Sequence, residues 1–352
     1  MSTNAQQTST PAATPELTAT SVSDVDSRGR YDVVIVGGGA AGLSAALVLG
    51  RTRRHVAVVD AGEPRNAPAA HMQGFLGSDG LPPAEFLARG RAEVASYGVD
   101  QISGTVADIT QNGTTTVASR TSTGPRFTVT LTDGTALETR AVLVTTGLRD
   151  DVPTIPGVHE RWGRDLLHCP YCHGWEVRDQ PLGVLAGDPT SFEETLAHAH
   201  IIRQWSNDVV LFANGATLTA AQREQLDARA IGIVDEPVVR LAIDDDHLTG
   251  VVIDGGRIVP RAAVFIRPQF VPNDTLLVDL GCAVRDNGLV QVDPTGATTV
   301  SGVWAAGNAI NPRAQVITAA GEGSAAAIAI NNALVDHDIR AALTNLRLGL
   351  PA

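Results

Sequence analysis

The hydrophobic residues of the chain are grouped into short, nearly continuous apolar runs that alternate with longer amphipathic stretches. Residues 31–36, 55–59 and 141–147 are such runs. A short run with few polar positions is typical of a strand buried on both faces of a parallel sheet. The stretch 83–97 has the spacing of a helix that begins at a proline. This alternation predicts an α/β fold.

Two segments between these runs alternate apolar and polar positions instead. They are 104–118 and 127–131, and an Asp-Gly turn follows the second at 133–134. Such alternation indicates strands with one exposed face, so we expect a β-meander before 141–147. Near the end, the small-residue segment 324–330 is too short to span a membrane and fits a buried helix.

The pattern of strand, turn, helix and strand recurs in the second half of the chain. Its members are 182–185, 191–205 and 208–212. Because one domain usually holds about 100–200 residues, we expect the 352-residue chain to contain two α/β units. Prolines mark a linker after the first unit, and we place a domain boundary near residue 152.

The overall charge narrows the range of partners. The formal net charge is −12 at pH 7, and the 26 basic residues are all arginines scattered along the chain. Nucleic acids and anionic membrane surfaces are bound by a concentrated basic face, so we expect neither as a partner. The absence of lysine also excludes a mechanism that needs a Schiff-base lysine.

Residues 1–30 are rich in Ser, Thr, Ala, Pro and Gln and contain no apolar run. This composition predicts a disordered tail. A secretory signal needs a positively charged start and about 7–15 apolar residues. We find neither and expect a cytoplasmic protein. Three cysteines are too few for a disulfide scaffold, so any function of theirs is local.

A glycine-rich turn directly follows the first apolar run. Gly37, Gly39 and Gly42 form the pattern G-x-G-x-x-G before an Ala- and Leu-rich helix, and Asp60 ends the next strand. The first glycine permits a tight turn, the second lets a pyrophosphate approach the backbone, and the third lets helix and strand pack closely. The acidic residue can hold a ribose hydroxyl. These features together predict a dinucleotide site.

The strongest chemical signal is the segment 168–174, which reads His-Cys-Pro-Tyr-Cys-His-Gly. Cys169 and Cys172 can close a disulfide with little backbone movement, and a helix N-terminus or a nearby His can lower a thiol pKa. Beside a βαβ pattern the pair is typical of redox exchange. Two alternatives stay open: a zinc site that uses His168 or His173 with a distant ligand, and thiols that only pack.

The second nucleotide-type turn lacks the features of the first. Residues 186–191 read Ala-Gly-Asp-Pro-Thr-Ser, which places Asp188 where the second glycine is needed. A carboxylate there would face pyrophosphate oxygens with like charge. Residues 213–215 read Ala-Asn-Gly where arginines or an acid are needed, and we expect Arg223 on a solvated helix face. NADPH binding is therefore doubtful.

These motifs and the segment 302–308, which reads Gly-Val-Trp-Ala-Ala-Gly-Asn, resemble the low-molecular-weight thioredoxin reductase family. The likeness extends from residue 31 to about residue 338. It implies two nested, three-layer Rossmann-like domains, and usually a homodimer. The implied FAD domain comprises 31–151 and 263–352, interrupted by a Cys-x-x-Cys domain of 152–262 with a degenerate nicotinamide-binding fold.

The resemblance also implies how FAD is held. The glycine turn and Asp60 would bind one end, and Asn308 and Gln315 would contact the ribityl and isoalloxazine end, with Arg65 and Thr146 as further candidates. The expected cofactor residues are thus Gly37, Gly38, Gly39, Gly42, Asp60, Arg65, Thr146, Gly307, Asn308 and Gln315. We assign no metal ligand.

Three departures from the reductase pattern point to one branch of this family. His173 stands where the reductases carry Asp, the nicotinamide-site arginines are missing, and Asn308 replaces the usual Asp. The first two features resemble the dithiol oxidases of gliotoxin and holomycin biosynthesis, which close disulfides in small molecules and pass electrons to oxygen. By this analogy we expect a dithiol to attack Cys169, Cys172 to pass electrons to FAD, and His173 to act as base.

Two other functions remain open. A thioredoxin-disulfide reductase would take electrons from NADPH or ferredoxin and pass them to a thioredoxin-like protein. A flavin-bound redox sensor would change conformation at the Cys pair without turnover. Of the remaining residues, we expect Cys282 to be a buried hydrophobic residue and the acidic segment 244–247 to be a turn. Trp175 either lines the substrate mouth or packs on the helix.

Overall fold

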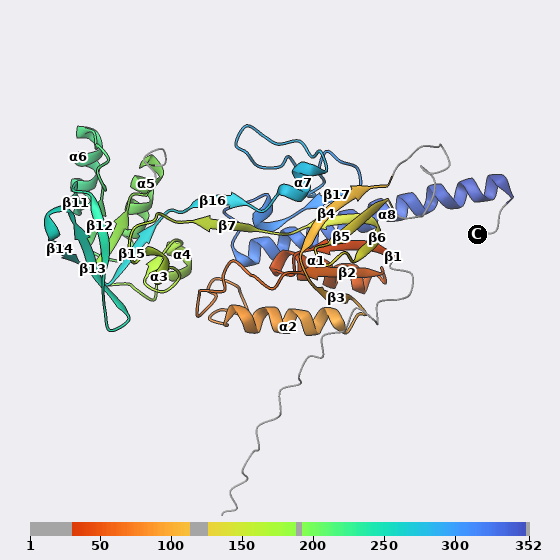
Figure 1. The fold of residues 1–352 in the computed structure, drawn as a ribbon, viewed down its shortest axis with the longest axis horizontal. Coiled ribbons are helices and arrows are strands. Elements are labelled where there is room, and N and C mark those ends of the chain that lie inside the picture. The colour runs from red at the N-terminus through yellow and green to blue at the C-terminus, as the bar shows by residue number, and fades with distance from the viewer. Residues whose placement is uncertain (1–29, 113–125, 188–191, 350–352) are drawn as a thin grey trace, which may run out of the picture.

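The computed structural model describes residues 30–112, 126–187 and 192–349, and these form two α/β units (Figure 1). The predictions for the N-terminal tail, for 113–118 and for Asp188 lie outside the described residues. The predicted pattern of alternating strands and helices is confirmed.

The first unit is built on a seven-stranded sheet in the order β3-β2-β1-β6-β5-β4, with β17 also paired to β6. Its parallel part consists of β1 (Arg30–Val36), β2 (Val56–Asp60), β3 (Asp100–Ser103), β6 (Ala136–Val144) and β17 (Val303–Ala305). The antiparallel part consists of β4 (Val106–Gln111), β5 (Phe127–Leu131) and β6. The β-meander is thus confirmed, and the last strand joins the first segment of the chain.

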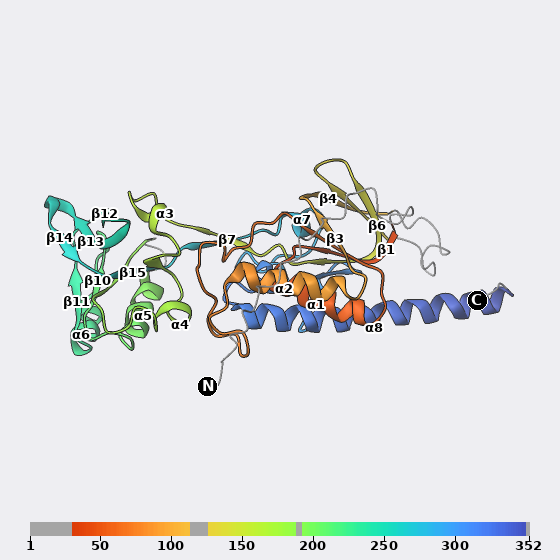
Figure 2. The ribbon, with the colours of Figure 1, turned by 90° about the horizontal axis from the view of Figure 1, so that it is seen from below.

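Helices cover the sheet mainly on one face. Figure 2 shows α1 (Ala40–Arg51), α2 (Pro83–Ala95) and α8 (Val316–Leu348) below the strands, while the short α7 (Thr275–Asp279) lies above. Successive residues of the central strands face opposite sides, so Val33 and Ile35 pack with α1 and α8. Val34 and Val36 pack with Leu277 of α7. Both faces of the parallel strands are therefore buried, as the continuous apolar runs predict.

The long helix α8 is fixed to the sheet by ion pairs. Asp338 accepts hydrogen bonds from Arg54, at 3.0 Å, and from Arg140, and Arg140 also contacts Asp32 at 2.7 Å. The small residues predicted to form a buried helix lie in the middle of α8, where Ala327 is fully buried. In the described part of the chain, no helix is both long and apolar enough to cross a membrane.

The second unit has a five-stranded parallel sheet in the order β11-β10-β9-β15-β8. The strands are β8 (Leu166–Leu167), β9 (Leu182–Leu185), β10 (Val209–Phe212), β11 (Ile231–Val234) and β15 (Ala263–Ile266). Its helices are α3 (Val158–Arg161), α4 (Pro170–His173), α5 (Phe192–Ile202) and α6 (Ala220–Ala228). An antiparallel sheet of β12 (Val238–Asp244), β13 (His247–Ile253) and β14 (Ile258–Pro260) completes the unit, with a 3₁₀ turn at Asp254–Gly256.

Two antiparallel strands connect the units. The chain leaves the first unit along β7 (Leu148–Asp151) and returns along β16 (Gln269–Pro272). The predicted boundary between residues 262 and 263 is wrong, because β15 pairs with β9 in the second sheet. The run 263–266 has the composition of any buried parallel strand, so its pattern does not indicate which sheet it joins.

A buried arginine joins α3 to the turn between β12 and β13. Arg161 is 1% exposed and donates to both carboxylate oxygens of Asp165, at 2.8 and 2.7 Å, and to Asp246 at 2.8 Å. Arg164 contacts Asp246 from the surface. The acidic segment 244–247 is thus a turn held by arginines, as expected.

Replacing Arg161 by Met should lower the free energy of unfolding by about 3 kcal/mol, because the partly buried Asp165 carboxylate would lose its arginine and keep only the hydrogen bond from the Leu248 N–H. Chemical denaturation followed by circular dichroism measures this change. Arg164→Met removes a half-exposed partner of the same turn and should cost less than about 1 kcal/mol. If both substitutions lowered the free energy of unfolding equally, Arg161 would not be the buried residue that holds α3 to the turn.

Candidate active site

The first glycine turn joins β1 to α1 in a conformation that leaves room for a ligand. Gly37 has a φ of 105°, and a Cβ added to Gly42 would lie 1.9 Å from the Gly37 carbonyl oxygen, so only glycine fits these positions. A Cβ added to Gly39 meets no atom within 4 Å. The backbone of Gly39 is therefore open to a pyrophosphate, as the spacing predicts.

Two side chains at the ends of neighbouring strands fix this turn. The Gly38 N–H donates to Asp60 Oδ1 at 3.0 Å, and the Thr145 hydroxyl donates to two carbonyl groups of the turn, at 3.0 and 2.8 Å. The hydroxyl of the next residue, Thr146, which we expect as a further FAD contact, donates to the Asn273 carbonyl at 2.5 Å, next to β16. Thr145 is thus the residue that supports the glycine turn.

Asn308 lies in a 3₁₀ turn, η5 (Gly307–Ala309), before α8. Its amide nitrogen donates to the carbonyl oxygens of Asn311 and Ala314 at 2.9 and 3.0 Å, and its amide oxygen accepts from Arg65 at 3.2 Å. An aspartate has no donor for two carbonyl groups. The amide at this position therefore holds the loop that leads into α8.

Gly307 and Gln315 lie at the two ends of this loop. The Gly307 N–H donates to Glu322 of α8 at 3.0 Å, and a Cβ added to Gly307 would lie 3.0 Å from the Ala41 Cβ in α1. Gln315 immediately precedes α8 and lies near Gly74. The structure thus brings the last segment of the chain against the helix that follows the glycine turn.

Arg65 links this loop to the connecting strands. Its guanidinium donates to both carboxylate oxygens of Asp150 in β7, at 2.8 and 2.6 Å, and lies 5.1 Å from the ring centroid of Phe270 in β16. The Asp150 side chain is 9% exposed, so solvent screens this ion pair little. No local sequence pattern marks Asp150 or Phe270, because these residues meet Arg65 only through tertiary folding.

Cys169 and Cys172 form a disulfide with a Cα–Cα distance of 5.2 Å. Pro170 begins α4, and the N–H groups of Cys172 and His173 donate to the Cys169 carbonyl at 3.1 Å each. Both cysteines are partly buried. Because α4 has only 4 residues, its helix dipole is weak.

Three histidines near the disulfide have depressed pKa values. Burial lowers the pKa of His173, against the opposing effect of the Glu176 charge. Burial is also the largest cause that lowers the pKa of His168 to about 4 and that of His198, in α5, to about 3. All three rings are therefore neutral at pH 7.

Two aromatic rings stand exposed beside the disulfide. Trp175 is 65% exposed, and the Arg178 guanidinium lies 4.0 Å from its ring centroid. Tyr171, between the two cysteines, is 63% exposed and contacts Trp205 edge-on at 5.8 Å. Trp175 is therefore not a core residue.

The Cys segment contacts the first unit directly. Gln73, in the loop before α2, donates to Glu176 at 3.2 Å. The His168 ring lies edge-on against Phe270, at 5.1 Å between centroids, and Arg65 contacts the same Phe270 ring. One aromatic ring thus separates the residue before Cys169 from the arginine that holds Asn308.

Near the second nucleotide-type turn, Asn214 and Arg223 form hydrogen bonds and an ion pair with residues of their own unit. The Asn214 amide donates to the Ala186 carbonyl at 3.1 Å and accepts from the N–H of Val238 at 2.8 Å. Arg223 is half exposed and pairs with Asp235 at 2.7 Å, as its predicted place on a solvated helix face implies. Neither side chain is free to bind a nucleotide phosphate without losing these contacts.

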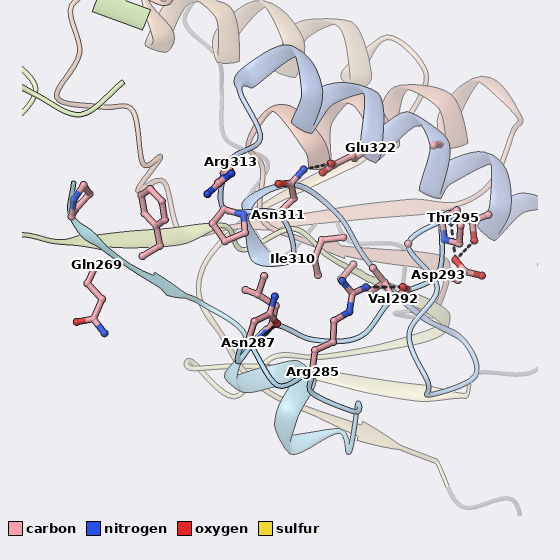
Figure 3. Close-up of a pocket in the computed structure, with 18 of the residues that line it drawn as sticks. Gln269, Arg285, Asn287, Val292, Asp293, Thr295, Ile310, Asn311, Arg313 and Glu322 are labelled. Carbon is pink, nitrogen blue, oxygen red and sulfur yellow. Dashed lines mark hydrogen bonds between the residues drawn. The ribbon is translucent and has the colours of Figure 1, made fainter. Parts of the chain in front are cut away.

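A cavity of about 900 Å³ lies beside β16, the loop 285–296 and the start of α8 (Figure 3). Arg267, Arg285 and Arg313 contribute to its wall, and Glu194 of α5 pairs with Arg267 at 3.0 Å. Neither Cys169 nor Cys172 lines it. The cavity is therefore separate from the disulfide.

The third cysteine is remote from this chemistry. Cys282 is 5% exposed in the core behind the first sheet, and burial raises the pKa of its thiol. It is the buried hydrophobic residue that we expected. Within 30–112, 126–187 and 192–349, no group of three or more His, Cys, Asp and Glu residues is arranged to hold a metal ion.

Comparisons with known proteins agree with this geometry. The family model described as pyridine nucleotide-disulphide oxidoreductase matches residues 31–323. A probable thioredoxin reductase of Arthroderma benhamiae is 34% identical over 186 residues, which are 53% of this chain and 44% of that protein. Thioredoxin reductase tcpT of Claviceps purpurea is 32% identical over 285 residues, which are 79% of this chain and 86% of that protein.

Among solved structures, the crystal structure of HlmI has a TM-score of 0.85 and 52% sequence identity, and covers 91% of this chain and 98% of that chain. These matches confirm the predicted fold and the resemblance to thioredoxin reductases. The chain therefore belongs to the pyridine nucleotide-disulphide oxidoreductase family.

Proposed function

We propose that the protein oxidises a small-molecule dithiol to a disulfide through Cys169 and Cys172, with FAD as cofactor and O₂ as electron acceptor. The observation that carries this proposal is the partly buried disulfide, whose neighbour His168 is linked through the Phe270 ring and Arg65 to Asn308, at the expected FAD site. Such a pair exchanges electrons with substrate thiols.

The residues of the first unit fit FAD. Space lies in front of Gly39, Asp60 fixes the turn, and Asn308 and Gln315 lie at the start of α8. When bound, FAD supplies the oxidant that restores the cysteine disulfide and passes two electrons to O₂, which becomes hydrogen peroxide. Arg65 contributes by orienting Asn308.

The cysteine pair performs the exchange in two steps. A substrate thiolate attacks the Cys169 sulfur, which family analogy makes the exposed one, and releases Cys172 as a thiolate. The second substrate thiol then attacks the substrate sulfur of the mixed disulfide and releases Cys169. The substrate has formed a disulfide, and two electrons and two protons have been transferred to the protein.

We assign to His173 the role of the base that accepts a proton from the incoming thiol. It directly follows Cys172 in the chain, and burial lowers its pKa so that the ring is neutral at pH 7. A neutral imidazole can act as a base, whereas the protonated ring cannot.

A second candidate function is a thioredoxin-disulfide reductase, which the names of the relatives favour. NADPH as its donor is disfavoured because Asn214 and Arg223 are engaged by neighbouring groups. A reductase that takes electrons from ferredoxin is a further variant, and a redox sensor without turnover is another function. Both differ from the proposed oxidase in how the flavin absorbance responds to a dithiol and then to air.

We also infer a homodimer in which α8 takes part. The outer part of α8 carries exposed apolar side chains at spacings of 4, 4 and 3 residues, which places them on one face: Val335, Ile339, Leu343 and Leu346. Figure 1 shows this part of α8 extending beyond the sheet. A second copy would remove the apolar stripe from water. The cytoplasmic location stays a prediction from the sequence.

Anaerobic addition of dithiothreitol to the purified flavin-bound protein should bleach the flavin absorbance, whereas NADPH should not. Air should then restore the absorbance and produce hydrogen peroxide. Cys172→Ser should retain bound flavin but lose bleaching by the dithiol, since no disulfide can form. Rapid bleaching by NADPH, or full dithiol oxidation by the Ser variant, would contradict the proposed function.

The pH dependence should report on His173. Glu176 raises the pKa of this ring, so Glu176→Gln should move the acid limb of kcat/KM to lower pH. His173→Gln should lower kcat/KM by about 100-fold or more, the usual contribution of a positioned base. Glu224→Gln, on the distant α6, serves as a charge-matched control without a shift. An acid limb that stays unmoved in Glu176→Gln counts against His173 as the base.

The dimer proposal is tested by placing charge on the α8 stripe. The double substitution Ile339→Asp and Leu343→Asp should convert a wild-type dimer into a monomer in sedimentation velocity. Ile258→Asp, at an equally exposed position in the second unit, should leave the dimer intact. A monomeric wild type, or a double variant that remains dimeric, would exclude α8 as the interface.

A further inference from the structure

Two aromatic rings stand on the turn that carries the disulfide. Tyr171, between the cysteines, is 63% exposed, and Trp175 is 65% exposed. They are the two most exposed aromatic side chains in the described part of the chain, and Tyr97 follows at 43%. Two such rings on one turn form an exposed apolar patch, and contiguous patches mark binding sites more often than isolated exposed residues do.

The local backbone places both rings next to Cys172. It is helical from Pro170 to Gly174, whose N–H donates to the Pro170 carbonyl at 2.7 Å. In helical backbone, residues three or four positions apart are surface neighbours, with Cβ atoms about 5–6 Å apart. Trp175 stands three positions after Cys172 and four after Tyr171. The two rings therefore share one side of the turn, and Trp175 borders the disulfide.

Both rings are fixed by contacts on one side. The Arg178 guanidinium lies 4.0 Å from the Trp175 ring centroid and donates to the Trp175 carbonyl at 2.5 Å. The Tyr171 ring meets Trp205 edge-on, at 5.8 Å between centroids. Trp205 also packs against the turn itself, because a Cβ added to Gly174 would lie 2.8 Å from its indole ring. A ring that is already held loses little conformational entropy when a ligand binds.

The area of this patch fits a small molecule. An aromatic side chain buries about 150–250 Å² when fully covered, so two rings that are almost two-thirds exposed offer about 200–300 Å² together. A stable protein interface takes about 800 Å² from each partner. Glu176, Arg178 and Asp179, which follow Trp175, are exposed and charged and do not extend the apolar area. The patch thus covers one ring system of a small ligand and is by itself too small for a protein partner.

We propose that Tyr171 and Trp175 bind the body of the dithiol substrate, and that they select a small dithiol with a flat apolar or aromatic body. The inference rests on the proposed dithiol oxidation and names the substrate class of that site. The body lies against the rings while a thiolate attacks the disulfide beside them. Each added aromatic contact raises affinity about 2- to 10-fold. A polar aliphatic dithiol has no ring to place against the patch and gains nothing from it.

The test compares two dithiols that oxidise to cyclic disulfides of the same ring size. They are ortho-benzenedimethanethiol, which has an aromatic body, and dithiothreitol, which has a polar one. The readout is the second-order rate constant with which each dithiol bleaches the flavin of the flavin-bound protein without air. We expect Trp175→Ala to lower the rate constant for the aromatic dithiol about 5- to 10-fold, and that for dithiothreitol by less than about 2-fold. Tyr171→Ala should act in the same sense, and Trp175→Phe, which keeps a ring, should retain most of the preference.

Tyr97→Ala is the matched control, because Tyr97 is also an exposed ring with an arginine guanidinium, that of Arg51, 5.1 Å from its centroid. It lies after α2 in the first unit, and its loss should leave both rate constants unchanged. Flavin content and the unfolding midpoint are measured for every variant, so that the rates refer to folded, flavin-bound protein.

Equal losses for both dithiols in Trp175→Ala would mean that the ring only supports the disulfide segment, and would overturn the inference. An unchanged rate constant for the aromatic dithiol would overturn it too. If Trp175→Ala slowed bleaching by reduced thioredoxin, a protein dithiol, but not by the aromatic dithiol, the patch would serve a protein partner instead. In each of these cases both small dithiols still bleach the wild-type flavin, and the proposed function stands. A wild-type flavin that neither dithiol bleaches overturns the proposed function, and this inference with it.

Discussion

The antiparallel pairing of β7 with β16 is the constraint on which the arrangement of the site depends. Asp150 and Phe270 are direct partners in this ladder, so their side chains lie on the same face of the connection. One guanidinium, that of Arg65, can therefore pair with the carboxylate and lie over the ring at once. A shift of the pairing by one residue would turn Asp150 and Phe270 to opposite faces and break this contact.

From this point, short contacts extend in both directions. Arg65 holds the amide of Asn308 on one side, and Phe270 contacts the ring of His168 on the other. Each contact joins groups that are neutral or already paired, so no isolated charge is buried along the way. Asn308 stands where the resemblance predicts Asp, and it also avoids an unpaired charge. A carboxylate at this position would face the carbonyl oxygens of Asn311 and Ala314 without a hydrogen to donate.

Much of the fold could be predicted because it is encoded in local pattern. The apolar runs mark the parallel strands, the glycine spacing marks the turn after β1, and the Cys spacing marks the disulfide. What could not be predicted depends on contacts between distant segments. β15 was placed in the wrong unit, and no local signal marks Thr145, Asp150 or Phe270. Periodicity shows that a residue is buried but not what it meets.

The core of the second unit is mainly built by residues outside the turn 186–191. It packs α5 against the parallel sheet through Leu196, Ala199, Ile202 and Phe265, and Ala186 is the residue of the turn that contributes to it in the described part of the chain. The turn can therefore lose the features that bind a nicotinamide nucleotide while the hydrophobic packing persists. The disulfide, in contrast, depends on this unit, because β15 and β16 supply the groups that contact His168. The same fold that binds a nucleotide elsewhere is thus suited to serve here as a rigid support for Cys169.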